Sequence, residues 1–113
     1  MTKVTFFKRE DGLLDGFEAS GHSGYGVFGS DIVCAAISAL TQAAAGGISE
    51  VVKAPAETRT DEDMGYFSCF LGANAAEEKR KNAQILLETL KMALEAISKD
   101  YPGTIRIILR ERR

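Results

Sequence analysis

The sequence has neither a net positive charge nor a long hydrophobic run. Its 113 residues carry a formal net charge of -2, so no broad basic field indicates a nucleic-acid-binding protein. The first residues, MTKVTFFKRED, contain no apolar run long enough for a signal peptide or a membrane span. The most apolar stretch, residues 32–45, is short and rich in small side chains, which favours a buried helix over a spanning one. We therefore expect a cytoplasmic protein that contacts no membrane and does not bind nucleic acid directly.

Cysteine and histidine are scarce as well. The chain has two cysteines, Cys34 and Cys69, and one histidine, His22. Cytosolic thiols stay reduced, so a structural disulfide is not expected. A zinc site would have to recruit carboxylates, and no pair of these residues has the spacing of metal ligands. We expect no metal and no cofactor.

The pattern along the chain predicts a single small α+β domain that spans residues 1–113. We expect the order ββ-α-ββ-α-β, with a mostly antiparallel sheet packed against two helices. The predicted strands are rich in β-branched and aromatic residues and cover residues 4–7, 13–20, 57–60, 66–71 and 104–109. The predicted helices cover residues 32–45 and 75–99. No repeat or linker interrupts this order.

The ends of both predicted helices carry recognisable capping residues. Ser30 or Asp31 can cap the first helix, and Gly46-Gly47 is a suitable end for it. Asn74 is the predicted cap of the second helix. Because the first helix is apolar nearly all round, we expect it to be buried on most faces. Either the sheet covers one side and another helix or a second subunit covers the rest, or the helix lies at the centre of the domain. This excess of apolar surface predicts a homodimer.

Cys34 lies in the first turn of the first helix, where a cysteine can do chemistry. The positive end of the helix dipole stabilises a thiolate there, and the exposed N–H groups can hydrogen-bond an oxyanion on an attacked carbonyl. His22 lies upstream in a glycine-rich loop that can fold back over the helix terminus, so it can act as the base for the thiol. Each residue alone also has an ordinary interpretation, Cys34 as core packing and His22 as an idle surface group. Residue chemistry alone leaves these alternatives open.

Two segments carry a resemblance to a known family. Residues 21–26 are Gly-His-Ser-Gly-Tyr-Gly, and residues 29–40 are GSDIVCAAISAL. Together they resemble the ribosomal-processing cysteine protease family (Prp), whose pattern is a G-H-x-G-Y loop followed by G-x-D-I-V-C-A-A-x-S at a helix start. The likeness extends over the whole chain in length and in element order.

The resemblance implies a cysteine endopeptidase with His22 and Cys34 as its catalytic dyad. It further implies that the enzyme removes the short N-terminal extension of a bacterial large-subunit ribosomal protein, number twenty-seven, and cuts after an aromatic pair. This processing is needed for ribosome assembly, and the ribosomal protein precursor would be the peptide partner. Family members resemble homodimers, which agrees with the expectation from the apolar helix.

Other residues near the dyad are candidates for supporting roles. Asp31 is most simply a helix cap, and its carboxylate can alternatively orient His22. Ser38 shares a helix face with Cys34, so it either hydrogen-bonds its own backbone or helps to hold the site. Tyr25 and Phe28 either line an aromatic-accepting pocket or anchor the loop. The mobile loop that we expect to close over an extended peptide includes Gly21, Gly24, Tyr25, Gly26 and Gly29.

Two functions from other classes remain as alternatives. One is a non-catalytic ribosome-associated or RNA-binding module, which would use the basic residues Arg106, Arg110, Arg112 and Arg113; their plainer interpretation is a solvated strand end and tail. The other is a redox or acyl-carrying thiol protein, but no second cysteine lies at resolving distance in sequence from Cys34. Cys69 alternates with Phe67 and Leu71 along one strand, which predicts core packing.

Overall fold

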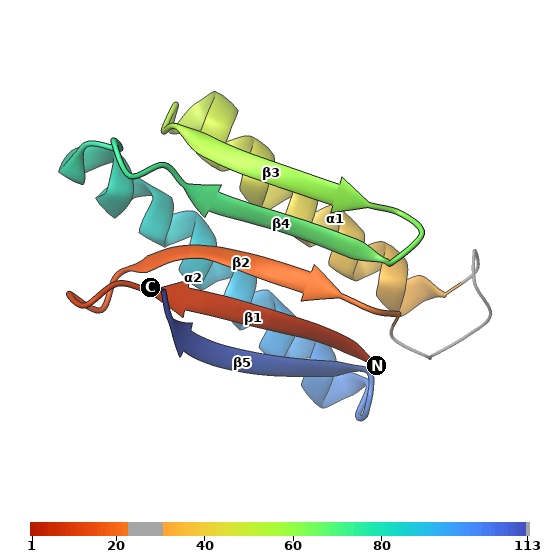
Figure 1. Cartoon of the computed structure of the whole chain (residues 1–113). Helices are drawn as coiled ribbons and strands as arrows, with labels where there is room; N and C mark the ends of the chain where they lie inside the picture. The colour runs from red at the N-terminus through yellow and green to blue at the C-terminus, as the bar shows by residue number, and fades with distance from the viewer. Residues whose placement is uncertain (23–30, 113) are drawn as a thin grey trace.

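The computed structural model describes residues 1–22 and 31–112 of the chain. Within these residues, two α-helices lie side by side on one face of a five-stranded sheet, and no helix covers the other face (Figure 1). In chain order the elements are β1 (Thr2–Lys8), β2 (Leu14–Ser20), α1 (Ile32–Gly46), the π-helical segment η1 (Gly47–Val51), β3 (Ala56–Asp61), β4 (Tyr66–Leu71), α2 (Glu77–Asp100) and β5 (Ile105–Glu111). The predicted order of strands and helices is confirmed.

The sheet has the strand order β3-β4-β2-β1-β5. The pairs β1–β2, β2–β4 and β3–β4 are antiparallel, whereas β1 and β5 run parallel. The long helix α2 lies between β4 and β5 in sequence and supplies the helical crossover that brings β5 alongside β1. The predicted α+β class with a mostly antiparallel sheet is therefore confirmed.

The core lies between the sheet and the two helices. Alternate residues of β1, β2 and β4 face the helices, because successive side chains of a strand point to opposite faces. Cys69 belongs to this core with 1% exposure, and burial raises the pKa of its thiol to about 11. The thiol is therefore protonated at neutral pH, and the prediction that Cys69 serves core packing is confirmed.

The α-helix ends at Gly46 with Gly47 as its C-cap residue, within one residue of the predicted end, but the chain keeps a helical path there. Gly46 and Gly47 keep right-handed helical angles, with φ of -62° and -61°, and the chain continues through η1 to Val51. A Cβ at position 47 would lie 2.9 Å from Cδ1 of Leu86, so a larger residue there would displace the end of that α2 side chain. Gly46 and Gly47 therefore mark the end of α1, but neither has the left-handed backbone that is typical of a glycine cap.

Within the chain α1 is buried on one face only, so its predicted burial on most faces depends on the expected second subunit and stays a prediction. One face is buried against the sheet and α2, and it consists of Val33, Ile37, Thr41, Ala44 and Ala45. The opposite side exposes Ile32 and several alanines to solvent. By length and composition alone, Ile32–Val51 is apolar enough to cross a membrane, with a mean hydropathy of 1.6. The core helix of a soluble protein can have the same composition, and α1 takes that place in this fold.

The second helix begins slightly later than predicted. Its N-cap is Ala76, which makes no side-chain capping bond, and not Asn74. Glu77 and Glu78 in the first turn provide the negative charge that favours a helix start. The buried face of the helix consists of Arg80, Ala83, Leu87, Leu90 and Leu94.

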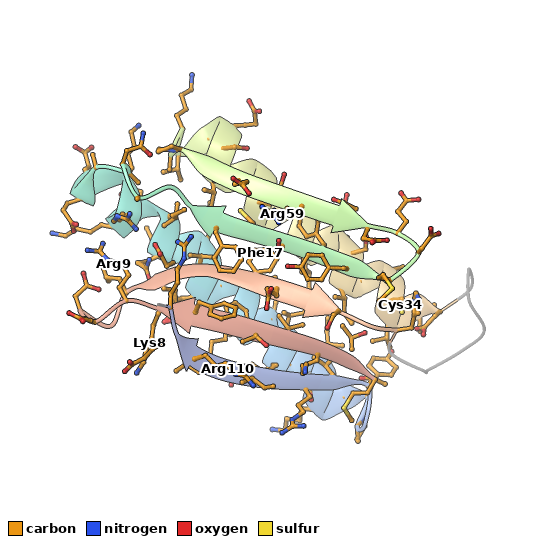
Figure 2. All side chains as sticks on the ribbon, viewed as in Figure 1. Lys8, Arg9, Phe17, Cys34, Arg59 and Arg110 are labelled. Atoms are coloured by element: carbon orange, nitrogen blue, oxygen red, sulfur yellow. The ribbon has the colours of Figure 1, made fainter. Side chains whose placement is uncertain are left out.

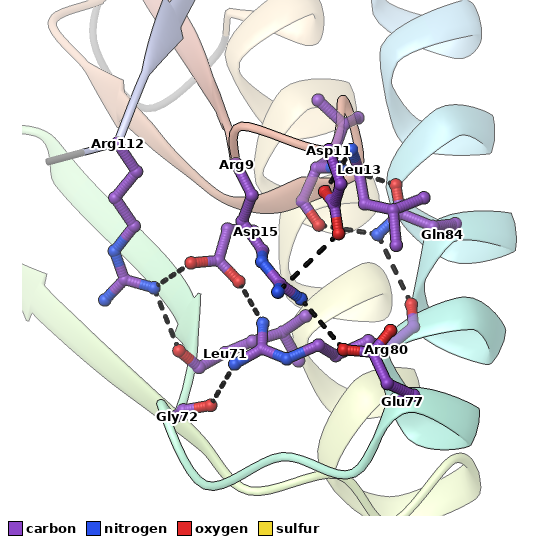
Figure 3. A network of polar contacts seen from close by, with 11 residues as sticks. Arg9, Asp11, Leu13, Asp15, Leu71, Gly72, Glu77, Arg80, Gln84 and Arg112 are labelled. Carbon is purple, nitrogen blue, oxygen red and sulfur yellow. Dashed lines mark hydrogen bonds and ion pairs between the residues drawn. The ribbon is translucent and has the colours of Figure 1, made fainter.

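A network of buried charges closes the end of the sheet at which β2 begins (Figure 3). Asp15 of β2 is 5% exposed, and its two carboxylate oxygens accept hydrogen bonds from Arg80 of α2 and from Arg112, which follows β5. Arg80 also donates to the carbonyl of Gly72 at 2.8 Å, and Arg112 donates to the carbonyl of Leu71 at 3.0 Å. The network thus connects β2, β4, α2 and the segment after β5.

Arg112 corrects the interpretation of the C-terminal basic residues. It was predicted to belong to a solvated strand end and tail, but it is bound to Asp15, and its guanidinium lies 4.7 Å from the centre of the Phe70 ring. Arg106 and Arg110 are exposed on β5, as predicted. Arg113 lies outside the described residues.

Candidate active site

A cavity of about 530 Å³ opens at the end of the sheet opposite the Asp15 network. It lies where β2 ends, α1 begins and the β3–β4 hairpin turns. His22 and Cys34 both line it, although they come from different elements. The volume falls within the range of about 300–1,000 Å³ that is common for sites that bind small ligands or short peptide segments.

The start of α1 is fixed by the side chain of Asp31. Its Oδ1 accepts hydrogen bonds from the backbone N–H groups of Val33, at 2.9 Å, and Cys34, at 3.0 Å. Asp31 is itself buried, so this cap is well shielded from water. The interpretation of Asp31 as the helix cap is therefore confirmed, and the cap holds the backbone of Cys34 in place.

The Asp31 cap also determines which backbone N–H groups at the start of α1 are available to bind an oxyanion. The sequence suggested that N–H groups of the first turn are exposed and can bind an oxyanion. In the structure the N–H groups of Val33 and Cys34 donate hydrogen bonds to the carboxylate of Asp31. The N–H of Ala35 donates to the backbone carbonyl of Asp31 at 3.1 Å. These three amides are therefore occupied in this conformation, and the expectation was wrong for them.

The two cysteines differ in accessibility. Cys34 is partly exposed on the cavity wall, whereas Cys69 is buried in the core, and both are free thiols. Figure 2 shows Cys34 at the N-terminal end of α1, on the side of the molecule where the β3–β4 turn lies. Of the two thiols, only Cys34 can therefore reach a peptide in the cavity.

His22 is exposed and lies two residues beyond the end of β2. The residue before it is held by its backbone, because the N–H of Gly21 donates to the carbonyl of Gly65 at 3.0 Å. Tyr66 also lines the cavity, and its hydroxyl donates a hydrogen bond to the carboxylate of Glu18 at 2.8 Å. Burial, together with the Glu18 carboxylate, raises the pKa of Tyr66, so its phenol stays protonated at neutral pH and is not available as a base.

Ser38 lies on the cavity wall one turn after Cys34. Its hydroxyl was interpreted as either a buried group bonded to its own backbone or a group that holds the site. The structure shows an exposed hydroxyl that accepts a hydrogen bond from Nε2 of Gln42 at 2.8 Å. The backbone-bonded hydroxyl of this helix is instead that of Thr41, which donates to the carbonyl of Ile37 at 2.8 Å.

The β3–β4 hairpin contributes lining residues that the sequence did not indicate as part of a site. Asp61 is the last residue of β3, Glu62 and Gly65 come from the turn, and Tyr66 and Phe67 come from β4. The run of three acidic residues at positions 61–63 was the one available signal, but nothing in sequence connects it to Cys34. Apart from His22, the charged side chains of the described cavity wall are Asp31, Asp61 and Glu62, and all three are acidic.

Part of the predicted substrate loop cannot be compared with the structure. Gly24, Tyr25, Gly26, Phe28 and Gly29 lie outside the described residues, so their roles remain predictions. Gly21 is described and has a left-handed backbone, with φ of 90°. Among residues 1–22 and 31–112, no three side chains of the types His, Cys, Asp and Glu gather as a metal ion would require.

Comparisons with known proteins identify relatives along nearly the whole chain. A family model described as Cysteine protease Prp matches residues 1–106. A protein of Bacillus subtilis named Ribosomal processing cysteine protease Prp is 32% identical over 109 residues, which covers 95% of this chain and 96% of that protein.

Solved structures have a similar fold. One is the crystal structure of an essential ribosomal processing protease Prp from S. aureus in complex with a covalently linked product peptide. It has a TM-score of 0.83 and 26% identity, and the match covers 96% of this chain and 99% of that chain. The crystal structure of SMU.848 from Streptococcus mutans also has a TM-score of 0.83 and 26% identity, with 99% and 96% covered.

Proposed function

Since the chain belongs to the cysteine protease Prp family, we propose that this cysteine protease removes the short N-terminal extension of a bacterial large-subunit ribosomal protein, number twenty-seven, in the cytoplasm. The cut follows an aromatic pair and serves ribosome assembly. The names of the relatives support a ribosomal protein as substrate. The alternatives of a non-catalytic RNA-binding module and of a thiol carrier are set aside, because the family is one of proteases.

The observation that carries the proposal is the shared position of Cys34 and His22 on one cavity wall. His22 takes the thiol proton, and the thiolate of Cys34 attacks the carbonyl carbon of the scissile bond. The tetrahedral intermediate collapses with loss of the amine, which receives the proton from His22, and leaves a thioester on Cys34. His22 then deprotonates a water molecule that hydrolyses the thioester and regenerates the thiol. The peptide covalently linked to the S. aureus protease supports such a covalent route.

Asp31 and Ser38 have supporting roles in this proposal. Asp31 fixes the backbone of Cys34 through the helix cap, so the sulfur keeps a constant position at the cavity. Ser38 and its partner Gln42 form the part of the wall one helical turn further on. Neither side chain exchanges a proton with the substrate.

The charge of the cavity wall supports a basic peptide as substrate. Asp31, Asp61 and Glu62 give the wall a negative character, which attracts cationic segments. Proteins that bind RNA carry many lysines and arginines, because these neutralise phosphates. A ribosomal protein precursor therefore has the right charge for this wall, and Phe67 offers an apolar contact beside it.

Cleavage of a synthetic peptide tests the proposal. The peptide carries an aromatic pair followed by a basic segment, and mass spectrometry identifies the cut. Wild type should cleave after the pair, and Cys34→Ala should lose at least about a thousandfold in kcat because no other nucleophile replaces the thiol. Cys69→Ala is the matched control and should keep its activity in the folded fraction, since Cys69 is in the core. Undiminished cleavage by Cys34→Ala would contradict the proposed nucleophile.

We also propose that the protein forms a homodimer through its helical layer. α1 exposes Ile32, Ala35, Ala39 and Ala43, and on α2 the large side chains of Ile85 and Met92 are exposed. Light scattering at micromolar concentration should give twice the 12.2 kDa mass of the chain. Ala39→Glu should reduce this mass, whereas Lys3→Glu, on the uncovered face of the sheet, should not. A wild-type protein with the mass of a single chain would contradict the dimer.

A further inference from the structure

The β3–β4 turn reaches the end of β2 (Figure 1), and its last residue lies beside His22. Its last residue, Gly65, accepts the hydrogen bond from the N–H of Gly21 at 3.0 Å. The turn is itself braced, since the carboxylate of Asp61 accepts a hydrogen bond from the N–H of Met64 at 3.2 Å. The position of Gly65 is therefore fixed relative to the residue that precedes His22.

Gly65 also lies directly against the imidazole ring of His22. A Cβ at position 65 would lie 3.2 Å from Nε2 and 3.3 Å from Cε1 of His22, and 3.2 Å from the carbonyl oxygen of Gly21. These separations are shorter than ordinary van der Waals contacts, so the ring would have to move by a few tenths of an ångström. Position 65 therefore has little room for a side chain while the His22 ring stays where it is.

We propose that Gly65 is a positioning residue for His22. It acts in two ways: its carbonyl anchors the backbone before His22, and its bare α-carbon leaves room for the edge of the ring that carries Nε2. This inference rests on the proposed role of His22 as the base for Cys34. A general base must lie within hydrogen-bond reach of the proton that it takes, and displacements of an ångström or less can lower the rate by up to about a hundredfold.

The backbone of Gly65 gives a competing reason for a glycine, which controls can separate. Its φ is 60°, a left-handed conformation that side chains disfavour wherever they occur. Gly12 and Gly103 are left-handed too, with φ of 87° and 79°, and a Cβ at either position would meet nothing within 4 Å. Gly12→Ala and Gly103→Ala therefore introduce the backbone strain without the contact to His22.

A further variant keeps the contact and reduces the strain. Asparagine adopts left-handed backbone angles more readily than alanine does. Gly65→Asn should therefore be more stable than Gly65→Ala, while its Cβ still crowds His22. If strain alone mattered, Gly65→Asn would recover activity; if the contact matters, it stays impaired.

The experiment measures kcat, KM and the pH profile of kcat/KM at a temperature where every variant is folded. Gly65→Ala and Gly65→Asn should lower kcat by about tenfold or more and shift the pH profile, while KM changes little. Gly12→Ala and Gly103→Ala should lose thermal stability but keep the kcat and pH profile of wild type. Equal kcat values for Gly65→Ala and Gly12→Ala would overturn the inference.

Alkylation of Cys34 by iodoacetamide separates this inference from the proposed function. The pH dependence of alkylation reports how His22 affects the thiol, and it needs no peptide substrate. Gly65→Ala should shift this dependence in the same direction as His22→Ala, whereas Gly12→Ala should not. If wild type cleaves no aromatic-pair peptide but the shift appears, the proposed substrate is wrong and the positioning role stands. If cleavage occurs without the shift, the positioning role is wrong.

Discussion

The two ends of β2 differ in what surrounds them. At its start, Asp15 is 5% exposed and both carboxylate oxygens are bound by arginine side chains. Just beyond its end, His22 is exposed and lines a cavity of about 530 Å³ together with Cys34. The closed end joins the sheet to α2 and to the segment after β5, and the open end leaves room for a peptide. Contacts that hold the fold and groups that meet the substrate are thus far apart, so variants can change stability and activity separately.

The largest effect on stability is expected at the closed end. Asp15→Asn removes the carboxylate charge while Arg80, 6% exposed, stays buried, and an uncompensated buried charge costs about 3–5 kcal/mol of the free energy of unfolding. Arg112 is more exposed, so the loss of its pair contributes less. Urea denaturation measures the change. The folded fraction should keep the kcat of wild type, because the cavity lies at the other end.

Glu77→Gln is the matched control for Asp15→Asn. It makes the same change from carboxylate to amide in the exposed ion pair between Glu77 and Arg9, in which Oε1 of Glu77 lies 3.4 Å from Nη1 of Arg9. Exposed pairs contribute little, so the free energy of unfolding should change by about 0.5 kcal/mol or less. If Asp15→Asn lowered the free energy of unfolding no more than Glu77→Gln does, the Asp15 network would not be what stabilises this end of the sheet.

An intermediate effect is expected where Asp31 caps α1. Asp31→Ala removes the acceptor for the N–H groups of Val33 and Cys34 and should lower the free energy of unfolding by about 1 kcal/mol. kcat should fall by about tenfold, because the backbone of Cys34 loses its anchor. Asp31→Asn keeps an acceptor oxygen, so its free energy of unfolding and its kcat should both fall less than those of Asp31→Ala. A rise in kcat would show instead that the carboxylate withholds amides that the reaction needs.

The smallest effect is expected on the acidic wall of the cavity. Glu62→Gln should raise KM for a basic peptide by about twofold to fivefold at low salt, with kcat unchanged. At 1 M salt the difference should disappear, because the screening length falls to about 3 Å. Asp63→Asn is the control, since Asp63 is the next residue of the turn but does not line the cavity. Equal KM changes for the two variants would assign the effect to overall charge.

Sequence predicted those features that depend on neighbouring residues. A cap at Ser30 or Asp31 follows from their place directly before the apolar run that begins at Ile32, and the structure has Asp31 there. The side of the strand on which Cys69 lies follows from alternation. Both hairpins follow from short turns between β-rich segments. The resemblance to the family then supplied the pairing of His22 with Cys34, which residue chemistry alone left open.

Sequence did not predict contacts between distant positions. Arg80 and Arg112 bind Asp15 from 65 and 97 residues away, and nothing in a local pattern connects these charges. The π-helical segment that follows α1 at Gly47–Val51 was not predicted either, because two adjacent glycines locally favour the end of a helix. The place of the 61–65 turn beside His22 likewise arises only when β4 pairs with β2.

The pairing of β1 with β5 has a consequence for the synthesis of the protein. Thr2 lies opposite Ile105, and Lys8 lies opposite Glu111, so the first and last strands are neighbours. Contacts between segments so distant in sequence close a long loop and form late in folding. On a translating ribosome, β1 therefore emerges long before β5, and its free edge is open to pairing with other chains until then. The sheet of this protease is completed only after the ribosome has made β5.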